Sequence, residues 1–186
     1  MSIAAVVLAA GASTRLGRPK QTLQLGGESL VERSARLAAE AGYSPIIIVT
    51  QPKADFAQAL QKQGWIVVVN ELAATGMSSS IRCGIDIAQS LNASGTVLMT
   101  CDQPSVTVSH MQALASEPGR RAGSEYSGRI GVPAYFPWSD FAALQLLEGD
   151  AGARELLRGA RFVSYEALAL DIDTEEDFRT AQATFG

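Results

Sequence analysis

Short apolar runs alternate with amphipathic helical patterns through the first half of the chain. Each run is the length of a strand that is buried on both faces of a sheet. The apolar runs are residues 3–9, 45–50, 65–69 and 96–101. The patterns between them repeat apolar residues at helical spacing and cover residues 28–41, 54–63 and 78–91. This order predicts parallel strands joined by right-handed helical crossovers, with helices on both faces of the sheet.

The pattern is less regular after Pro104. Further helices are predicted at residues 106–115, 140–147 and 175–185, the last after a Thr174 cap. Strands are predicted at 132–136 and, more weakly, at 162–165 and 167–170, while the polar stretch 119–131 is predicted as a loop. We find neither an internal repeat nor a linker. We therefore expect one domain over residues 1–186, an α/β fold with a three-layer α/β/α sandwich and a mostly parallel, Rossmann-like sheet.

Composition narrows the class of protein. A chain of 186 residues with 47% apolar residues can bury a sizeable core. The net charge of −4 argues against a general nucleic-acid binder and against a membrane-surface protein. No apolar run is long enough to span a membrane, and Met1 to Ile3 leads directly into the first predicted strand, leaving no room for a signal peptide. We therefore expect a cytoplasmic protein.

The segment from Gly11 to Lys20, directly after the first predicted strand, is the clearest chemical signal. Its small residues allow backbone N–H groups to approach a ligand, and Arg15, Arg18 and Lys20 can neutralise phosphates. The glycine spacing matches neither the dinucleotide fingerprint nor the mononucleotide P-loop. We interpret the segment as a binding loop for a nucleoside triphosphate, the alternative being an ordinary turn with solvated cations.

Two aspartates follow predicted strands at the edge of the sheet where ligands bind. Asp102 follows the strand at 96–101, and Asp173 lies between the last predicted strand and the last helix. They are candidates to share a Mg²⁺ ion, which favours carboxylate and phosphate oxygens. Asp150, in a second glycine-containing loop, is an alternative second ligand, and each carboxylate could instead cap a helix.

The segment Gly76-Met77-Ser78-Ser79-Ser80 opens a predicted helix. Its N–H groups could bind a polar edge of a base or an anion, and the Ser80 hydroxyl could contact a nucleobase, although the serines could also simply cap the helix. Arg120, Arg121 and Arg129 lie in the polar loop, where they could contact an anionic acceptor or be solvated, and we expect Arg120 and Arg121 to be solvated.

The remaining reactive side chains favour no other chemistry. Cys83 and Cys101 lack the spacing of a metal or redox site and are expected to be buried thiols. His110 is the only histidine and is predicted on a solvated helix. The chain has no G-x-S-x-G nucleophile elbow, so carboxylates and cations are its chemical equipment.

These motifs resemble those of the nucleotidyltransferases of molybdenum cofactor maturation, specifically the molybdenum cofactor cytidylyltransferase-like branch. The first motif is Leu8-Ala9-Ala10-Gly11-Ala12-Ser13 with Arg15, Gly17, Pro19 and Lys20. The later motifs are Gly76 to Ile81 with Gly84, Asp102-Gln103-Pro104, Gly149-Asp150 with Gly152-Ala153-Arg154, and Asp171 to Thr174. The resemblance covers nearly the whole chain and implies the nucleotidyltransferase fold.

The resemblance also implies the roles of individual residues. Arg15, Lys20 and Asp102 would be catalytic, with Asp102 and Asp173 as ligands of Mg²⁺. The nucleotide-binding residues would be Leu8, Ala9, Ala10, Gly11, Arg15, Lys20, Gly76, Ser80 and Asp102. Ala10 stands where the guanylyl branch has glycine and indicates CTP rather than GTP.

The implied reaction moves CMP from CTP to the terminal phosphate of a molybdopterin-type acceptor. A transient contact with a cofactor-receiving molybdoenzyme is also implied. Two positions depart from the family pattern: Val132 replaces a usual histidine on the acceptor side, and Glu175 stands where proline is frequent. The alternatives are a cytidylyltransferase for a sugar or polyol phosphate, and a nucleotide-binding module without turnover.

Overall fold

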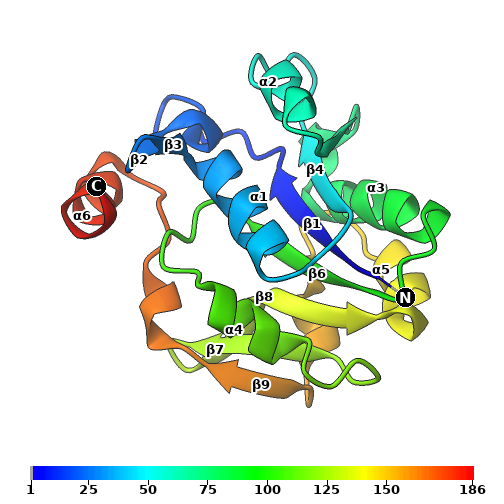
Figure 1. Cartoon of the computed structure of the whole chain (residues 1–186). Helices are drawn as coiled ribbons and strands as arrows, with labels where there is room; N and C mark the ends of the chain where they lie inside the picture. The colour runs from blue at the N-terminus through cyan, green and yellow to red at the C-terminus, as the bar shows by residue number, and fades with distance from the viewer. Residues whose placement is uncertain (1) are drawn as a thin grey trace.

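The centre of the molecule is a seven-stranded sheet in the order β5-β4-β1-β6-β8-β7-β9 (Figure 1). The computed structural model describes residues 2–186, so Met1, which the predicted domain includes, lies outside them. The strands of this sheet are β1 (Ile3–Ala9), β4 (Ile46–Thr50), β5 (Ile66–Val69), β6 (Gly95–Thr100), β7 (Ala122–Tyr126), β8 (Arg129–Pro137) and β9 (Arg161–Ser164). All neighbouring pairs are parallel except those that involve β8. The predicted mostly parallel sheet is confirmed.

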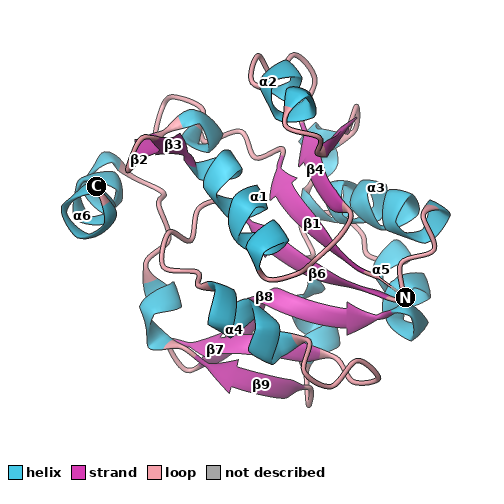
Figure 2. Cartoon of the chain, viewed as in Figure 1, coloured by secondary structure: helices cyan, strands magenta, loops and turns pink. Residues whose placement is uncertain are grey.

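Helices cover both faces of this sheet (Figure 2). Alternate residues of β1 face opposite sides: Ala5, Val7 and Ala9 pack in one apolar cluster, and Ala4, Val6 and Leu8 in the other. The first cluster receives α1 (Leu30–Glu40), α2 (Ala57–Lys62) and α4 (Val108–Leu114). The second receives α3 (Met77–Ser90) and α5 (Phe141–Gln145). This is the predicted three-layer α/β/α sandwich.

A third apolar cluster lies apart from the sheet. It joins Leu16 of the cation-rich loop (residues 11–20), the small hairpin of β2 (Gln24–Leu25) and β3 (Glu28–Ser29), and α6 (Glu175–Phe185). Ile172, Phe178 and Ala181 are its contribution from the C-terminal segment. Figure 1 shows α6 beside the hairpin. This helix is the last element of the chain, yet it packs near the loop that contains Leu16, close to the start of the chain.

Several sequence predictions for the second half of the chain are wrong. The stretch predicted as a loop at 119–131 contains β7 and the start of β8, a hairpin whose polar sequence hides its pairing. Residues 167–170 are not a strand, because Glu166–Ala169 form a 3-10 turn in which Leu168 alone is buried. His110 is 5% exposed rather than solvated.

No helix in residues 2–186 is long and apolar enough to cross a membrane. The prediction of one domain over the whole chain stays a prediction.

Candidate nucleotide site

A cavity of about 550 Å³ opens where β1, β4 and β6 end. Strand order reverses between β1 and β6, since β4 and β5 extend from one side of β1 and β6 pairs on the other. Open parallel sheets bind ligands at this switch point, and the volume is that of a small-molecule site. The cavity is lined by seven of the predicted site residues, namely Leu8, Ala10, Gly11, Lys20, Gly76, Ser80 and Asp102.

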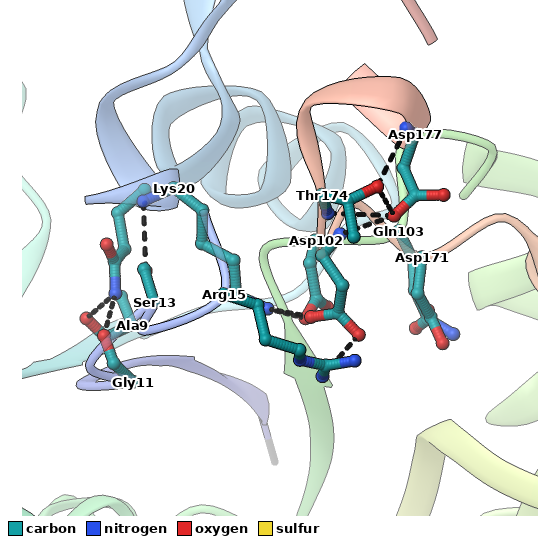
Figure 3. Close-up of polar contacts among 12 residues, drawn as sticks. Ala9, Gly11, Ser13, Arg15, Lys20, Asp102, Gln103, Asp171, Thr174 and Asp177 are labelled. Carbon is teal, nitrogen blue, oxygen red and sulfur yellow. Dashed lines mark hydrogen bonds and ion pairs between the residues drawn. The ribbon is translucent and has the colours of Figure 1, made fainter. Parts of the chain in front are cut away.

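The loop after β1 is shaped by a glutamine that the motif analysis did not select. Gln21 is 1% exposed, and its side-chain amide donates to the carbonyl oxygens of Ala9 at 3.0 Å and Gly11 at 2.7 Å (Figure 3). Ser13 Oγ accepts the backbone N–H of Lys20 at 3.0 Å. These bonds hold the two ends of the loop together. Ala9 contributes its carbonyl oxygen to them and does not itself line the cavity.

Lys20 lies between two carboxylates that are far apart in sequence. Its Nζ is 2.5 Å from Asp102 Oδ2 and 3.1 Å from Asp173 Oδ1, and Arg15 binds the other Asp173 oxygen at 2.7 Å (Figure 3). Burial alone would lower the pKa of Lys20, but the two carboxylates outweigh it and raise the pKa. Lys20 therefore remains charged at neutral pH.

The backbone brings these two carboxylates together. The N–H of Ile172 donates to the carbonyl oxygen of Asp102 at 2.9 Å, which fixes the C-terminal segment beside the end of β6. Asp173 does not cap α6, because Thr174 is the N-cap and forms a reciprocal capping box with Asp177. Asp102 does not cap α4, whose N-cap is Thr107. Helix capping therefore explains neither aspartate.

The arrangement suits a divalent cation as well as an ammonium group. Asp102 and Asp173 direct oxygens at one position, which Lys20 Nζ holds. Within residues 2–186, no three His, Cys, Asp or Glu side chains form a complete metal cluster. A site of two carboxylates is what Mg²⁺ uses when phosphate oxygens supply further ligands. Asp150 lines the cavity too.

Asp171 stands beside this pair. Burial, together with the charges of Asp102 and Asp173, raises the pKa of Asp171 to about 6. Arg129 approaches Asp171 at 3.9 Å. Arg129 is therefore the arginine of the polar segment that lies near the candidate site.

The start of α3 is fastened to the second glycine-containing loop. The backbone N–H and the hydroxyl of Ser78 both donate to the carbonyl oxygen of Gly149, at 3.2 and 2.7 Å. Gly76 has φ +117°, and a Cβ there would lie 2.3 Å from that same oxygen. Only glycine permits this close approach, which places Asp150 at the cavity.

Other residues considered from the sequence lie away from the cavity. Arg15 and Asp173 belong to the charged cluster but do not line the cavity. Arg121 pairs with Asp140 at 2.7 Å and is structural rather than solvated, whereas Arg120 is exposed. Both cysteines are free thiols, and Cys101 is buried as predicted, but Cys83 is only half-buried, so the prediction for Cys83 is wrong.

Comparison with known proteins relates this chain to a family of nucleotidyltransferases. The profile of the MobA-like NTP transferase domain matches residues 5–167. Purine catabolism protein PucB of Bacillus subtilis is 31% identical over 93% of this chain and 92% of its own length. Nicotine blue oxidoreductase of Paenarthrobacter nicotinovorans is 32% identical over 94% and 93%. A protein named "Probable molybdenum cofactor guanylyltransferase" from Opitutus terrae is 30% identical over 91% and 79%.

Solved structures agree with these sequence relationships. Rv0371c of Mycobacterium tuberculosis superimposes with a TM-score of 0.83 at 28% identity, covering 98% of this chain and 99% of that one. A manganese complex of the same protein gives a TM-score of 0.77 at 27% identity, covering 99% and 100%. Because the family profile covers most of the chain, the chain belongs to the MobA-like NTP transferase family of nucleotidyltransferases.

Proposed function

We propose that this nucleotidyltransferase moves CMP from CTP to the terminal phosphate of a molybdopterin-type acceptor and releases pyrophosphate. The observation that carries the proposal is the cavity in which the loop after β1 faces Asp102. Ala10, which lines this cavity, supports CTP, whereas the relatives named guanylyltransferases make GTP the competing nucleotide.

In this proposal the acceptor needs little acid–base help. A terminal phosphate has its second pKa near 6 and is largely a dianion at neutral pH. One of its oxygens attacks the α-phosphorus of CTP, and the bond to the bridging oxygen of pyrophosphate breaks. The protein contributes by positioning the two phosphates and stabilising the charge that develops.

The residues divide this work between them. Backbone groups of Leu8, Ala10 and Gly11 line the nucleotide, Gly76 allows the base to approach α3, and Ser80 contacts the base. Lys20 and Arg15 leave their carboxylate partners to bind the triphosphate and offset the negative charge on the leaving pyrophosphate. Asp102 and Asp173 would hold Mg²⁺. When bound, that ion supplies positive charge to the phosphate oxygens.

The test begins with nucleotide binding. Thermal shifts are measured with CTP, GTP, ATP and UTP, each with Mg²⁺. A ligand at about 100 times its dissociation constant stabilises the native state by about 2.7 kcal/mol, so CTP is expected to raise the melting temperature and GTP to have little effect. A shift with GTP alone would contradict the cytidylyl assignment.

Turnover decides the acceptor. Pyrophosphate release is followed with CTP and either molybdopterin cofactor or a sugar or polyol phosphate. We expect release with the molybdopterin-type acceptor. Release only with a sugar or polyol phosphate would identify the alternative transferase, and binding of CTP without release from any acceptor would favour a nucleotide-binding module. The cytoplasmic location and the transient molybdoenzyme contact stay predictions.

A further inference from the structure

We propose that Asn70, which does not line the cavity, is a positioning residue that makes the hydroxyl of Ser80 a hydrogen-bond donor to the base. The proposal rests on the proposed nucleotide function and deepens it, because it specifies what the base must present at that point. It is carried by a chain of buried hydrogen bonds between the end of β5 and the start of α3.

The orientation of the Asn70 amide is determined by the backbone. Asn70 follows β5 and is 5% exposed. Its Oδ1 accepts the N–H of Leu72 at 2.9 Å. A backbone N–H can only donate, so the amide oxygen must be on this side and the NH₂ group on the other. Asn70 therefore presents two donors to α3.

Both of these donors meet serine hydroxyls. Asn70 Nδ2 lies 2.8 Å from Ser79 Oγ and 2.9 Å from Ser80 Oγ. The hydroxyl of Ser79 donates its own hydrogen bond to a carbonyl oxygen, either that of Leu72 at 2.9 Å or that of Gly76 at 2.8 Å. Ser79 is thus fully committed to protein groups.

Ser80 differs from Ser79 in one respect. Its oxygen accepts from Asn70, but no acceptor in the described part of the chain, residues 2–186, takes its proton. Ser80 also lines the cavity, while Ser79 does not. Since Asn70 occupies an acceptor position of the hydroxyl, the proton is left for a ligand in the cavity.

A donor at this place selects among bases. Cytosine presents two adjacent acceptors, N3 and O2, on its pairing edge. Guanine presents two donor groups on the corresponding edge and one acceptor, O6. The Ser80 donor therefore matches either of two acceptors of cytosine but only O6 on the guanine edge, which is consistent with CTP as the proposed nucleotide.

The test reverses the polarity of the amide without changing its size. In Asn70→Asp, one carboxylate oxygen can still accept the N–H of Leu72, while the other accepts protons from the serines. Ser80 then turns its proton away from the cavity. We expect the affinity for CTP with Mg²⁺, measured by calorimetry, to fall about tenfold or more. Asn92→Asp, the same change at an exposed site, should leave that affinity unchanged.

A double-mutant cycle separates positioning from a structural role. In the Ser80→Ala background, Asn70→Asp should change the CTP affinity by less than about threefold, because the group that Asn70 orients is gone. An equal loss in both backgrounds, or an unchanged affinity in Asn70→Asp, would overturn the proposal. Asn70→Ala, which deletes the amide, should weaken CTP binding less than Asn70→Asp, although it removes more protein contacts.

The Asn70→Ala variant also carries the test if Asn70→Asp does not fold: its loss of CTP affinity should likewise vanish in the Ser80→Ala background, and an equal loss there would overturn the proposal. If the unchanged protein binds none of the nucleotides, the proposed function fails and this inference with it. If it binds CTP but the variants bind equally well, only the role of Asn70 fails.

Discussion

At the scale of single residues, the site is a balance of charges between Lys20 and its two carboxylates. Lys20 is 16% exposed and Asp102 is 17% exposed, so water screens their attraction less than it does at the open surface. Without a nucleotide, each charge satisfies the other. A triphosphate with its cation can replace these partners one for one, because it brings negative charge to Lys20 and positive charge to Asp102.

Asp102→Asn tests this balance. It keeps the shape of the side chain and removes its charge, so it should reduce turnover about 10²-fold or more, the scale of a lost preorganised electrostatic contact. Steady-state pyrophosphate release in Mg²⁺ measures the effect. Asp55→Asn, at an exposed position, is the matched control and should keep the normal rate. A normal rate in Asp102→Asn would remove Asp102 from the catalytic machinery.

His110 provides a residue-scale prediction for stability. Its Nε2 lies 2.7 Å from Ser124 Oγ, which donates its own proton to the carbonyl oxygen of Pro133 at 2.6 Å. His110 must therefore donate to Ser124, and it stacks on Tyr165 at 5.0 Å. Burial lowers the pKa of His110 to about 4. The ring is neutral and structural rather than catalytic.

This lowered pKa makes stability depend on pH. The unfolded chain binds a proton at His110 below about pH 6.5, while the folded protein does so only near pH 4. The contribution of neutral His110 to the free energy of unfolding is therefore fully present above about pH 6.5. It is lost as the pH falls toward 4, and the loss is about 2 kcal/mol at pH 5. Asp171, whose pKa is raised to about 6, contributes in the opposite direction over this range, so the measurement is a comparison of urea unfolding at pH 7 and pH 5 in the unchanged protein and in His110→Gln. The loss of stability from pH 7 to pH 5 should be smaller in His110→Gln. An identical pH dependence in the variant would contradict the assignment.

At the scale of elements, the start of α3 depends on its fit to the loop that contains Gly149. Gly76→Ala places a Cβ 2.3 Å from the Gly149 carbonyl oxygen at a φ of +117°, which a side chain rarely adopts. We expect a melting temperature lower by several degrees and weaker CTP binding, since the loop carries Asp150 to the cavity. Gly119→Ala, where a Cβ would meet nothing within 4 Å, is the control. Equal behaviour of the two variants would show that this contact is unimportant.

The element scale also shows where sequence patterns stop being informative. The strands of the first half are apolar on both faces because helices cover both sides of the sheet. Their burial can therefore be predicted from their composition. By contrast, β7 reads Ala-Gly-Ser-Glu-Tyr and has no such signature. Its strand conformation comes from pairing with β8 and β9, and at Gly123 a Cβ would lie 2.3 Å from Ile130.

At the scale of the whole molecule, the C-terminal helix supports a loop that lies at the start of the chain. Phe178 of α6 is 7% exposed in the cluster that contains Leu16, and the Arg18 guanidinium lies 5.5 Å from the centre of its ring. Arg18 also pairs with Glu175 at 2.7 Å. The position of the cation-rich loop therefore depends on α6.

Phe178→Ala should reveal this dependence. Truncating a buried phenylalanine costs about 3–5 kcal/mol of unfolding free energy, and here it should also weaken CTP binding because the loop loses its support. Urea unfolding and calorimetry measure the two effects. Phe162→Ala, at a phenylalanine that is 49% exposed, should change both much less. If the affinity of Phe178→Ala for CTP were normal, the loop would be positioned without α6.

The sequence by itself determined the class of fold, most strands and helices of the first half, and seven of the residues that line the cavity. These features are local: burial on two faces demands apolar runs, and a loop built to receive phosphates needs small residues and cations next to a strand. The site residues Lys20, Ser80 and Asp102 could be predicted for the same reason, since each lies in or next to a segment with a recognisable pattern.

Only the tertiary structure decided which of these features meet. Lys20 and Asp173 are 153 residues apart, and their contact depends on the strand order and on the bond between Ile172 and Asp102. The roles of Gln21 and Asn70 likewise follow from hydrogen bonds that no spacing along the chain encodes. Periodicity reports which side of an element is buried, whereas a contact between distant segments depends on how the whole chain packs.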